Sequence, residues 1–452
     1  MTDAPGDNSA GPHTGYGTPN YRAFVLAMLV ALYTFNFIDR VLIAIVQEPI
    51  KKEFGLSDTL LGLLGGPTFA ILYTLLGIPI ARLAERKNRT TILMIGVGLW
   101  SAATAVCGLA SSYIMLLLAR VGVSVGEASL TPSANSIIGD YFPADRRATA
   151  ISIYSLGVPF GSALAAIGGG FIAQHLGWRE AFYSLGLPGL ILAVAFKLTV
   201  KEPPRQSEAH EMPDFVEALK AMASKPTFWH VSLGAAAAAF TGYGVGQFTN
   251  SFFIRTHHLE IFQASLITGT LVGVFGGLGT FVSGFLADRI GKKHPNALAW
   301  LPVLGFVVTT PLNMAAYMVA SLPLAVGLLA VALTFQYLYL GSQYSITCAV
   351  VHPRMRATAV AVLLLVINMI GYGLGPLVLG MISDLINTSL MAPQGLTMAI
   401  CKHAAGTIHE AACSASSATG LQYSIVIGFL GYLWAATHFM FAWKYMQRDW
   451  HR

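Results

Sequence analysis

Long hydrophobic stretches recur along almost the whole chain, separated by short polar segments. Many of them reach the roughly 20 residues that an α-helix needs to cross the hydrocarbon layer of a membrane. Because a backbone in lipid must satisfy its own hydrogen bonds, each stretch is expected to be a helix. We therefore predict an all-α membrane protein with twelve spans, at residues 22–47, 58–82, 91–110, 113–139, 147–172, 179–197, 228–253, 263–288, 297–319, 323–350, 354–383 and 421–446.

The basic residues predict how these spans are oriented, because Lys and Arg gather in cytoplasmic loops. With a cytoplasmic N-terminus, all but seven of the 27 Lys and Arg residues fall on the cytoplasmic side or in the tails. The exceptions are Arg40, Lys51, Lys52, Arg120, Arg179, Arg255 and Lys402. We expect both termini to be cytoplasmic in a multi-pass protein of the cell membrane, and the bacterial inner membrane is the expected location.

Composition agrees with a membrane environment and explains the basic balance. The chain is 55% hydrophobic and 11% charged, against roughly 25% charged in an ordinary soluble domain. Basic loops beside lipid headgroups account for the net charge of +6, since such loops bind the anionic membrane surface. The lipid bilayer is therefore the expected partner, and no nucleic acid is expected.

The four cysteines fall into two pairs. Cys107 and Cys348 lie in predicted spans, where a packing role is expected. Cys401 and Cys413 share the loop between the last two spans, on the predicted outer side. An oxidising compartment permits a disulfide between them. The alternative is two free thiols.

The chain contains two similar halves. Residues 81–89 (ARLAERKNR) lie between spans 2 and 3, and residues 284–293 (GFLADRIGKK) lie between spans 8 and 9. The tetrapeptide RATA precedes spans 5 and 11, at 147–150 and 356–359, and a segment containing glycine and proline follows each copy. Tandem six-helix units of this kind predict a pseudo-two-fold axis along the membrane normal and a substrate site between the bundles.

The predicted organisation has five parts. They are a disordered cytoplasmic N-terminus (1–21), an N-terminal six-helix bundle (22–197), a cytoplasmic linker (198–227), a C-terminal six-helix bundle (228–446) and a cytoplasmic tail (447–452). Within the linker, Pro203 and Pro204 end a helix. Phe215, Leu219 and Met222 then follow at helical spacing, which predicts a short amphipathic surface helix.

Two sets of motifs resemble a known family. The segment Gly284 to Lys293 is similar to the signature loop of the major facilitator superfamily, and the resemblance covers residues 22–446. Within that superfamily, residues 36–40 (NFIDR) in span 1, with 120–122 (RVG) and 126–128 (GEA) in span 4, resemble the spinster group. The resemblance implies twelve helices in two pseudo-symmetric bundles and secondary active transport by alternating access. It also implies export of an amphiphilic lipid such as a lysophospholipid or sphingolipid.

Charged side chains inside predicted spans are candidates for function, because burying one near the centre of a span costs at least roughly 2.5–3.5 kcal/mol. Asp39, Arg120 and Glu127 qualify. At 1.5 Å per residue, Asp39 and Arg120 reach similar depths in a core of about 30 Å, so an ion pair between them fits. Glu127 lies two helical turns deeper than Arg120 on nearly the same face, so it looks into the same cavity.

These positions predict a coupling mechanism. Burial and a nearby arginine act in opposite directions on the pKa of a carboxyl group, which favours proton exchange during transport. We predict that Asp39 is the main protonation site, that Arg120 holds it ionised or binds an anionic headgroup, and that Glu127 senses or relays. Asn36 and Arg40 border this set, and Arg40, about 100° away from Asp39, is an alternative headgroup anchor. The alternative for the set is a static ion pair between spans 1 and 4.

Spans 7 to 11 hold no charged side chain away from their ends, so the cavity candidates of the second half are neutral. They are Tyr243, Gln247 and Asn250 in span 7, Gln336, Tyr337 and Gln343 in span 10, and Asn368 and Tyr372 in span 11. Charges facing an apolar, aromatic half suit a substrate with a polar head and a hydrocarbon tail. The alternative is that these polar residues pack helices together.

The two signature loops predict a cytoplasmic gate. Their carboxylates can accept hydrogen bonds from helix N-termini and pair with arginines, which would fasten the cytoplasmic face while the outer face is open. The predicted gate residues are Glu85, Arg86, Arg146, Arg147, Asp288 and Arg289.

The chain lacks several sequence motifs of enzymatic chemistry. It has no HExxH zinc motif, no aspartate cluster for a diphosphate and metal site and no P-loop. We therefore expect no enzyme, no metal and no cofactor, with the proton gradient as the energy source and a monomer as the working unit. The alternative substrate is a small organic anion or drug. The alternative from another class is a ligand-binding membrane sensor without turnover.

Overall fold

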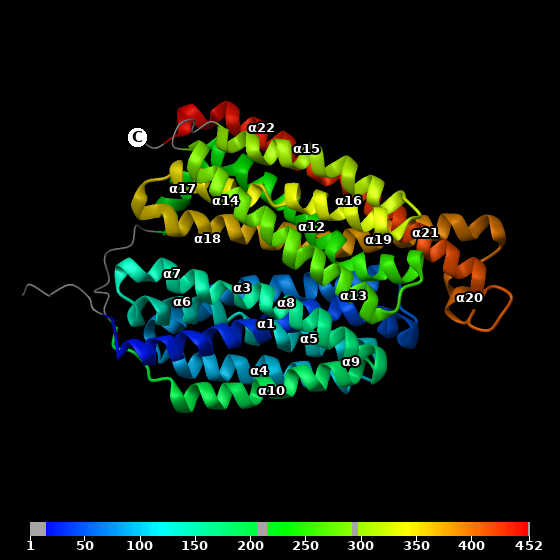
Figure 1. Ribbon diagram of the computed structural model, residues 1–452, viewed down its shortest axis with the longest axis horizontal. Coiled ribbons are helices and arrows are strands. Elements are labelled where there is room, and N and C mark those ends of the chain that lie inside the picture. The colour runs from blue at the N-terminus through cyan, green and yellow to red at the C-terminus, as the bar shows by residue number, and fades with distance from the viewer. Residues whose placement is uncertain (1–14, 206–214, 292–296, 451–452) are drawn as a thin grey trace, which may run out of the picture.

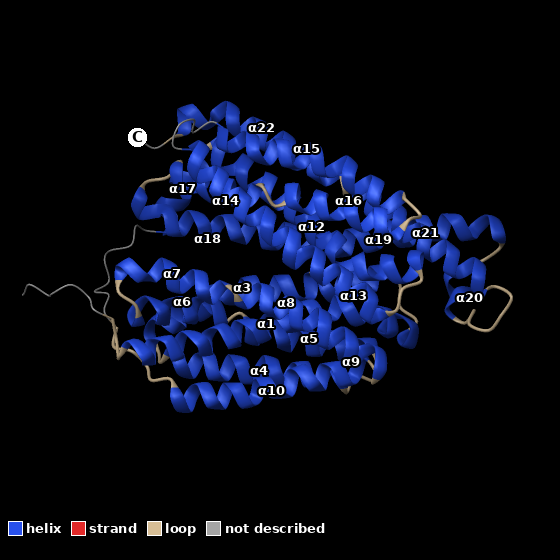
Figure 2. Ribbon diagram, in the orientation of Figure 1, coloured by secondary structure: helices blue, strands red, loops and turns tan. Residues whose placement is uncertain are grey.

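The computed structural model describes residues 15–205, 215–291 and 297–450. Within these ranges every regular element is a helix, as Figure 2 shows. The predicted all-α class is therefore confirmed for the described part of the chain.

The helices form two groups that lie side by side along their length (Figure 1). The elements from α1 to α10, blue to green, form the lower group, which we call the N-half. The elements from α12 to α22, green to red, form the upper group, which we call the C-half. This arrangement agrees with the repeat in the sequence.

The N-half contains the six predicted spans before the linker. Its elements are α1 (Pro19–Phe54), α2 (Asp58–Gly65), α3 (Pro67–Arg86), α4 (Arg89–Gly108), α5 (Tyr113–Glu127), α6 (Leu130–Tyr141), α7 (Ala144–Ser155), α8 (Gly157–Leu164), the π-helix η1 (Ala165–Gly169), α9 (Gly170–His175) and α10 (Trp178–Thr199). The predicted linker helix is present as α11 (Phe215–Ala223), and its Met222 is fully buried.

The C-half contains the other six predicted spans. Its elements are α12 (Pro226–His257), α13 (Ile261–Thr270), the π-helix η2 (Leu271–Gly276), α14 (Gly277–Gly291), α15 (Ala297–Met318), α16 (Leu322–Gln336), α17 (Tyr339–Ala349), η3 (Pro353–Met355), α18 (Arg356–Val366), the π-helix η4 (Ile367–Tyr372), α19 (Gly373–Met391), η5 (Ala392–Gln394), α20 (Met398–Lys402), α21 (Glu410–Gly428) and α22 (Leu430–Asp449).

Eleven helical segments among the described residues are long and apolar enough to cross a membrane. They correspond to eleven of the twelve predicted spans. The remaining span is α12, which has 32 residues and is long enough. Glycine, threonine and glutamine interrupt its apolar residues, and it is not among the eleven. These polar residues are tolerated because α12 is buried on many sides. Phe248, Phe252 and Phe253, for example, are fully buried within the bundle.

Several spans are interrupted where the sequence is rich in glycine. Span 2 breaks at Gly66, between α2 and α3, and span 4 breaks between Glu127 and Leu130. Spans 5, 8 and 11 each contain a π-helical segment, η1, η2 and η4. These wide turns leave the chain helical while changing the direction in which later side chains point.

The two halves meet closely at one end of the molecule, at the right in Figure 1, which we call the sealed end. There Gly62 packs against the backbone of Pro376, and Gly380 packs against the backbone of Asp58, so tightly that a Cβ atom would overlap. The other end, at the left, holds the end of α22 and the start of α1. We call it the terminal end.

A hairpin between α19 and α21 projects beyond the sealed end (Figure 1). The predicted disulfide between Cys401 and Cys413 is present there, with the two Cα atoms 5.5 Å apart. The hairpin reaches the N-half, because the side chain of Lys402 lies against Gly55. Gly55 ends α1 with φ of 60°, a left-handed conformation that glycine adopts without a Cβ penalty.

Some helices begin or end at other residues than predicted. α1 begins at Pro19, three residues early, and Tyr16 already donates its backbone N–H to the carbonyl of Tyr141. Residues 1–14, which belong to the predicted disordered N-terminus, lie outside the described residues. The predicted tail is shorter than expected, because α22 continues to Asp449. The Asp449 carboxylate accepts hydrogen bonds from the backbone and the hydroxyl of Thr227, which anchors the start of α12.

Candidate functional site

Five polar side chains predicted to share one cavity lie together inside the N-half. Asn36, Asp39 and Arg40 come from the middle of α1, and Arg120 and Glu127 come from α5. We call these five residues the mid-bundle cluster. Glu127 is the last residue of α5, where span 4 is interrupted, and Arg120 precedes it by two turns of helix. The predicted depths on spans 1 and 4 therefore agree with the structure.

The ion pair of the cluster joins Arg40 and Glu127. Arg40 Nε donates to Glu127 Oε2 at 2.8 Å, and the Glu127 side chain is fully buried. The Arg40 side chain remains 21% exposed. The long side chain of Arg40 turns back onto α5 and forms the accessible edge of this charge cluster. The alternative in which Arg40 anchors a headgroup stays a prediction.

The predicted ion pair between Asp39 and Arg120 is not formed in this conformation. Arg120 Nη1 donates instead to the backbone carbonyl of Asp39, at 3.3 Å. The Asp39 carboxyl group faces Thr104 on α4 and the charges of Arg120 and Glu127. The depth along each helix was right, but depth does not specify which way a side chain turns around the helix axis.

The mid-bundle cluster leaves several buried polar atoms without a hydrogen-bond partner among the described residues. They are both side-chain polar atoms of Asn36, Asp39 Oδ1, Glu127 Oε1, and Nε and Nη2 of Arg120. Buried polar groups in proteins are nearly always paired, since an unpaired one costs about 1–3 kcal/mol. So many in one place indicate a site prepared for a ligand or for a proton.

Aromatic rings form the wall between this cluster and the C-half. Phe69, at the start of α3, lies under the guanidinium groups of Arg40 and Arg120, with Cζ to ring-centroid distances of 5.0 and 5.4 Å. The rings of Phe69 and Tyr372, which belongs to the C-half, pack edge to face with their centroids 5.5 Å apart. Tyr372 in turn packs against Tyr243 at 4.7 Å. Tyr243 is 47% exposed, so the C-half side of this wall is accessible.

The remaining neutral candidates of the C-half separate into different environments. Gln247 is buried at the sealed end, where Nε2 donates to Gln47 Oε1 at 2.7 Å. Asn250 Oδ1 accepts from Thr268 at 3.1 Å. Gln343 is buried, and its Oε1 has no partner among the described residues. Gln336, Tyr337 and Asn368 are half-buried. Tyr243 and Tyr372 are therefore the two candidates that the structure brings to the mid-bundle cluster.

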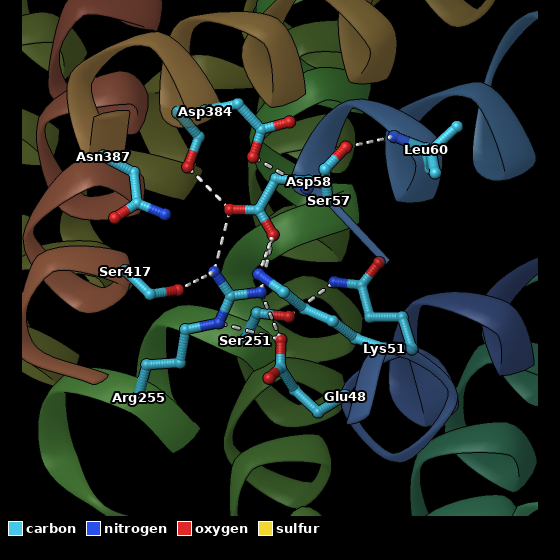
Figure 3. Close-up of polar contacts among 12 residues, drawn as sticks. Glu48, Lys51, Ser57, Asp58, Leu60, Ser251, Arg255, Asp384, Asn387 and Ser417 are labelled. Carbon is cyan, nitrogen blue, oxygen red and sulfur yellow. Dashed lines mark hydrogen bonds and ion pairs between the residues drawn. The ribbon is translucent and has the colours of Figure 1, made fainter. Parts of the chain in front are cut away.

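A second charge cluster joins the two halves at the sealed end (Figure 3). Arg255 of the C-half binds two N-half carboxylates, with Nη2 at 2.6 Å from Glu48 Oε1 and at 2.8 Å from Asp58 Oδ1. Its Nη1 also donates to Asp58 Oδ2 at 2.8 Å. Lys51 adds a second cation, 2.6 Å from Asp58 Oδ1. All of these hydrogen bonds are charge-assisted, which makes them the strong kind.

Asp384 of the C-half completes this cluster by binding the N-terminus of α2 (Figure 3). Its carboxylate accepts the backbone N–H groups of Asp58 and Thr59 at 2.9 and 2.8 Å, and the Thr59 hydroxyl at 2.6 Å. A negative charge is favourable at this position, because the first N–H groups of a helix carry a partial positive charge. We call Glu48, Lys51, Asp58, Arg255 and Asp384 the sealed-end network.

The residues of the predicted cytoplasmic gate lie at the opposite end of the molecule. The side chains of Glu85 and Asp288 lie outside the described residues. Arg86 and Arg146 are exposed, and Arg147 Nε donates to the carbonyl of Phe142 in its own half. Arg289 lies over the ring of Phe285, also in its own half. The gate was predicted for a state with the outer face open, so it stays a prediction.

Sequence reasoning missed the sealed-end network and Phe69. A signal existed for the network, since Arg255 was one of the seven basic residues on the predicted outer side. Acidic residues stood at neighbouring span ends, at Glu48, Asp58 and Asp384. Each taken alone is an ordinary interfacial charge, so only the tertiary contacts reveal the set. Phe69 carries no signal in the sequence beyond its position three residues after Gly66.

Comparison with known proteins supports the resemblance that the sequence predicted. The sequence model described as "Major Facilitator Superfamily" matches residues 28–376. An "MFS-type efflux pump" from Mycolicibacterium smegmatis is 33% identical over 376 residues, which are 82% of this chain and 87% of that protein. "Protein spinster homolog 1" from Homo sapiens is 28% identical over 402 residues, 81% of this chain and 74% of that protein.

A solved structure gives the same result in three dimensions. The crystal structure of a bacterial homolog to the human lysosomal transporter spinster, in an inward-facing and unoccupied conformation, has a TM-score of 0.90 and 38% identity. The match covers 96% of this chain and 100% of the chain in the crystal structure. The major facilitator fold and the multi-pass membrane architecture predicted from the sequence are thereby confirmed, whereas the cytoplasmic location of the termini stays a prediction. This chain belongs to the Major Facilitator Superfamily and to its spinster group, and it is a membrane transporter rather than an enzyme.

Proposed function

We propose that this transporter couples proton movement to the export of an amphiphilic lipid, such as a lysophospholipid or sphingolipid, by alternating access. It works as a monomer in the cell membrane of a bacterium, without a cofactor, and the proton gradient supplies the energy. The observation that carries this proposal is the mid-bundle cluster. In it two buried carboxylates, Asp39 and Glu127, each keep one oxygen without a hydrogen-bond partner.

The proposed proton exchange follows from the unpaired oxygen of each of these two carboxylates. A buried carboxylate with saturated hydrogen bonds is held in its charged form, whereas one with a free oxygen changes protonation at lower cost. Glu127 exchanges its proton in competition with Arg40, which is partly exposed and so connects the cluster to the aqueous side of the cavity. Proton uptake at this position would weaken the Arg40 pair and change the charge presented to a substrate.

The amphiphilic substrate is supported by the contrast between the walls. The N-half wall offers the guanidinium group of Arg40, which suits a phosphate or another anionic headgroup. The C-half wall near it offers the rings of Tyr243 and Tyr372, which suit an apolar or amphipathic partner. The printed names of the similar proteins, spinster homologs and a bacterial homolog of a lysosomal transporter, agree with a transporter of this kind.

The proposed orientation places both termini in the cytoplasm. The sealed end, with the disulfide between Cys401 and Cys413, then faces the outside, which is the oxidising side. In this proposed orientation the conformation is closed to the outside. This assignment agrees with the similarity to a transporter solved in an inward-facing conformation.

Transport in proteoliposomes tests the proposal. Purified protein is reconstituted with a lysophospholipid that carries a fluorescent acyl chain, and its movement between leaflets is followed by quenching, with and without an imposed pH gradient. We expect the gradient to accelerate movement in the parent protein. The variant Glu127→Gln, which keeps the shape of the side chain but cannot ionise, should reduce the gradient-driven rate to the level of protein-free vesicles.

Glu53→Gln is the matched control. Glu53 pairs with Arg179 at the surface, where its side chain is 40% exposed, and exposed pairs contribute little. This variant should transport like the parent. Movement that ignores the gradient in the parent would disprove proton coupling, and a Glu127→Gln variant that responds like the parent would disprove the role of the cluster.

A small organic anion or a drug is the alternative substrate, and the similar efflux pump is the observation that favours it. In the same vesicles, a zwitterionic lysophospholipid and a non-amphiphilic aromatic anion can compete. Inhibition by the anion with no movement of the lipid would support the alternative. Specific ligand binding without flux of either probe would instead indicate a sensor.

A further inference from the structure

We propose that Phe69 is a positioning residue that couples the charge state of the mid-bundle cluster to the C-half. This inference deepens the proposed proton coupling and rests on it. Phe69 was not singled out by the sequence, it carries no charge, and it is fully buried. Its importance follows from what lies on each side of its ring.

The break in span 2 places this ring. α2 ends at Gly65, and α3 begins at Pro67 after Gly66, whose φ and ψ of −103° and −96° are not helical. The backbone N–H of Phe69 donates to the carbonyl of Gly66 at 3.1 Å, which fixes the first turn of α3. The ring therefore points from a rigid helix start into the boundary between the halves.

Both arginines of the cluster share the ring of Phe69. The Cζ atoms of Arg40 and Arg120 lie 5.0 and 5.4 Å from its centroid, within the roughly 6 Å over which a cation is attracted to an aromatic face. Among the described residues it is the one ring that lies over both guanidinium groups. Arg40 is the partner of Glu127, and Arg120 contacts the backbone of Asp39. The ring of Phe69 therefore contacts both arginines that interact with the two acidic residues.

On its other side the ring contacts the C-half. The planes of Phe69 and Tyr372 meet at 82° with centroids 5.5 Å apart, an edge-to-face geometry that aromatic pairs prefer. Tyr372 is the last residue of the π-helix η4 in span 11. The next residue, Gly373, faces Ala70, which follows Phe69, since a Cβ atom placed on Gly373 would lie 3.6 Å from the Cβ atom of Ala70. A displacement of Phe69 therefore reaches the wide turn of span 11 directly.

The charges around the cluster show how a proton would move the ring. Asp39 faces Arg120, Glu127 and the thiol of Cys107 on α4, while Arg40 faces Glu127 and the phenols of Tyr73 and Tyr372. The phenols of Tyr33, Tyr154 and Tyr243 also interact electrostatically with Arg40. When Glu127 takes up a proton, Arg40 loses its anionic partner. Attraction to the rings of Phe69 and Tyr73 then determines where the guanidinium group of Arg40 lies. The ring of Phe69 moves with the guanidinium group, and Tyr372 moves with Phe69.

A conformational measurement with a pH axis tests this inference. Spin labels are attached to cysteines that replace the exposed residues Asp145 and Arg354, one on each half at the terminal end, after the half-buried Cys348 is replaced by serine. The ratio of open to closed populations is then measured between pH 5 and pH 8 in nanodiscs. One proton linked to the conformational change alters this ratio by up to about tenfold per pH unit. We expect a clear pH response in the parent.

Replacing the aromatic ring of Phe69 by a large aliphatic side chain should break the coupling between the mid-bundle cluster and the C-half. In Phe69→Leu we expect the two populations to remain but their ratio to lose most of its pH dependence. Phe69→Tyr keeps the aromatic face and should retain the response. Phe37→Leu is the matched control, because Phe37 lies over Arg40 alone, at 5.4 Å, and should respond like the parent. If Phe69→Leu does not give a monodisperse protein, Tyr372→Leu carries the same prediction from the C-half side.

The outcomes separate this inference from the proposed function. A parent protein with no pH response would disprove the proposed proton coupling itself. A parent that responds together with a Phe69→Leu variant that responds equally would disprove the role of Phe69 and leave proton coupling intact. Loss of the response in both Phe69→Leu and Phe69→Tyr would show that the ring is only packing, which also overturns the inference.

Discussion

The mid-bundle cluster and the sealed-end network both place several charges inside a membrane protein, but they differ in how completely those charges are paired. In the sealed-end network, Arg255 makes hydrogen bonds to Glu48, Asp58 and Ser417. In the mid-bundle cluster, Arg120 has two side-chain nitrogens without a partner among the described residues. A saturated buried network makes a structure rigid, whereas a partly satisfied one carries an energetic cost that only function explains.

The two clusters also differ in what they connect. The sealed-end network links residues of the N-half to residues of the C-half, so it holds one conformation of the transporter together. The mid-bundle cluster lies within the N-half and meets the C-half through aromatic rings rather than through ion pairs. Buried charges therefore serve two purposes here. In the sealed-end network they hold the halves together, and in the mid-bundle cluster they remain free to change their pairing.

The largest effect is expected from removing the cation of the sealed-end network. Arg255→Ala would leave the carboxylates of Glu48 and Asp58 buried with Lys51 as their remaining cation. Breaking a buried ion pair typically costs about 3–5 kcal/mol. We expect the sealed end to open, seen as a longer distance between spin labels at the exposed positions Ser111 and Gln394. Arg255→Lys, which keeps the charge but loses the planar fork, should show a smaller change. An unchanged distance in Arg255→Ala would show that the network does not hold the halves together.

A smaller effect is expected from the carboxylate that binds the start of α2. Asp384→Asn keeps the shape of the side chain but removes the negative charge, and a hydrogen bond to a charged group contributes about 1.5–3 kcal/mol. The same pair of labels should report a partial shift toward the open sealed end. Thr388→Ala is the control on the same helix, since its hydroxyl bonds only to the carbonyl of Asp384. Equal shifts in both variants would rule out a specific role for the carboxylate.

The smallest effect on stability is expected in the mid-bundle cluster. Asp39→Asn removes a buried charge whose Oδ1 has no partner, so the free energy of unfolding should change by less than about 1 kcal/mol. Thermal unfolding in detergent measures this. The same variant should nonetheless lose the response of lipid movement to a pH gradient in proteoliposomes. A loss of stability as large as that of Arg255→Ala would erase the distinction between the two clusters.

The fold could be predicted from the sequence because membrane spans carry a strong and redundant signal. Length, apolar composition and the distribution of Lys and Arg are read over some 20 residues at a time, so single errors average out. The interruptions could not be predicted in the same way. Span 2 was predicted as one continuous helix, although Gly66 and Pro67 stand at its break. Whether a glycine-rich segment becomes a π-helix, as η4 does, depends on the neighbouring helix.

The candidate site was predictable in part, and for a physical reason. Depth along a helix follows from residue number, so Asp39, Arg120 and Glu127 could be placed at compatible levels. The rotation of each helix and the rotamer of each long side chain do not follow from residue number. The true partner of Glu127 was therefore missed, although Arg40 stands next to Asp39 in the sequence. A set that spans both halves, such as Arg255 with Asp58, lies 197 residues apart and is visible only after folding.

The π-helical segments in spans 5, 8 and 11 have a mechanical consequence. A wide turn loosens the regular hydrogen bonding of a helix, so each of these spans can bend at η1, η2 or η4 while both of its arms remain helical. The arms near the sealed end can stay fixed while the arms near the terminal end swing. Movement of the two halves in this transporter therefore does not require each of them to rotate as one rigid body.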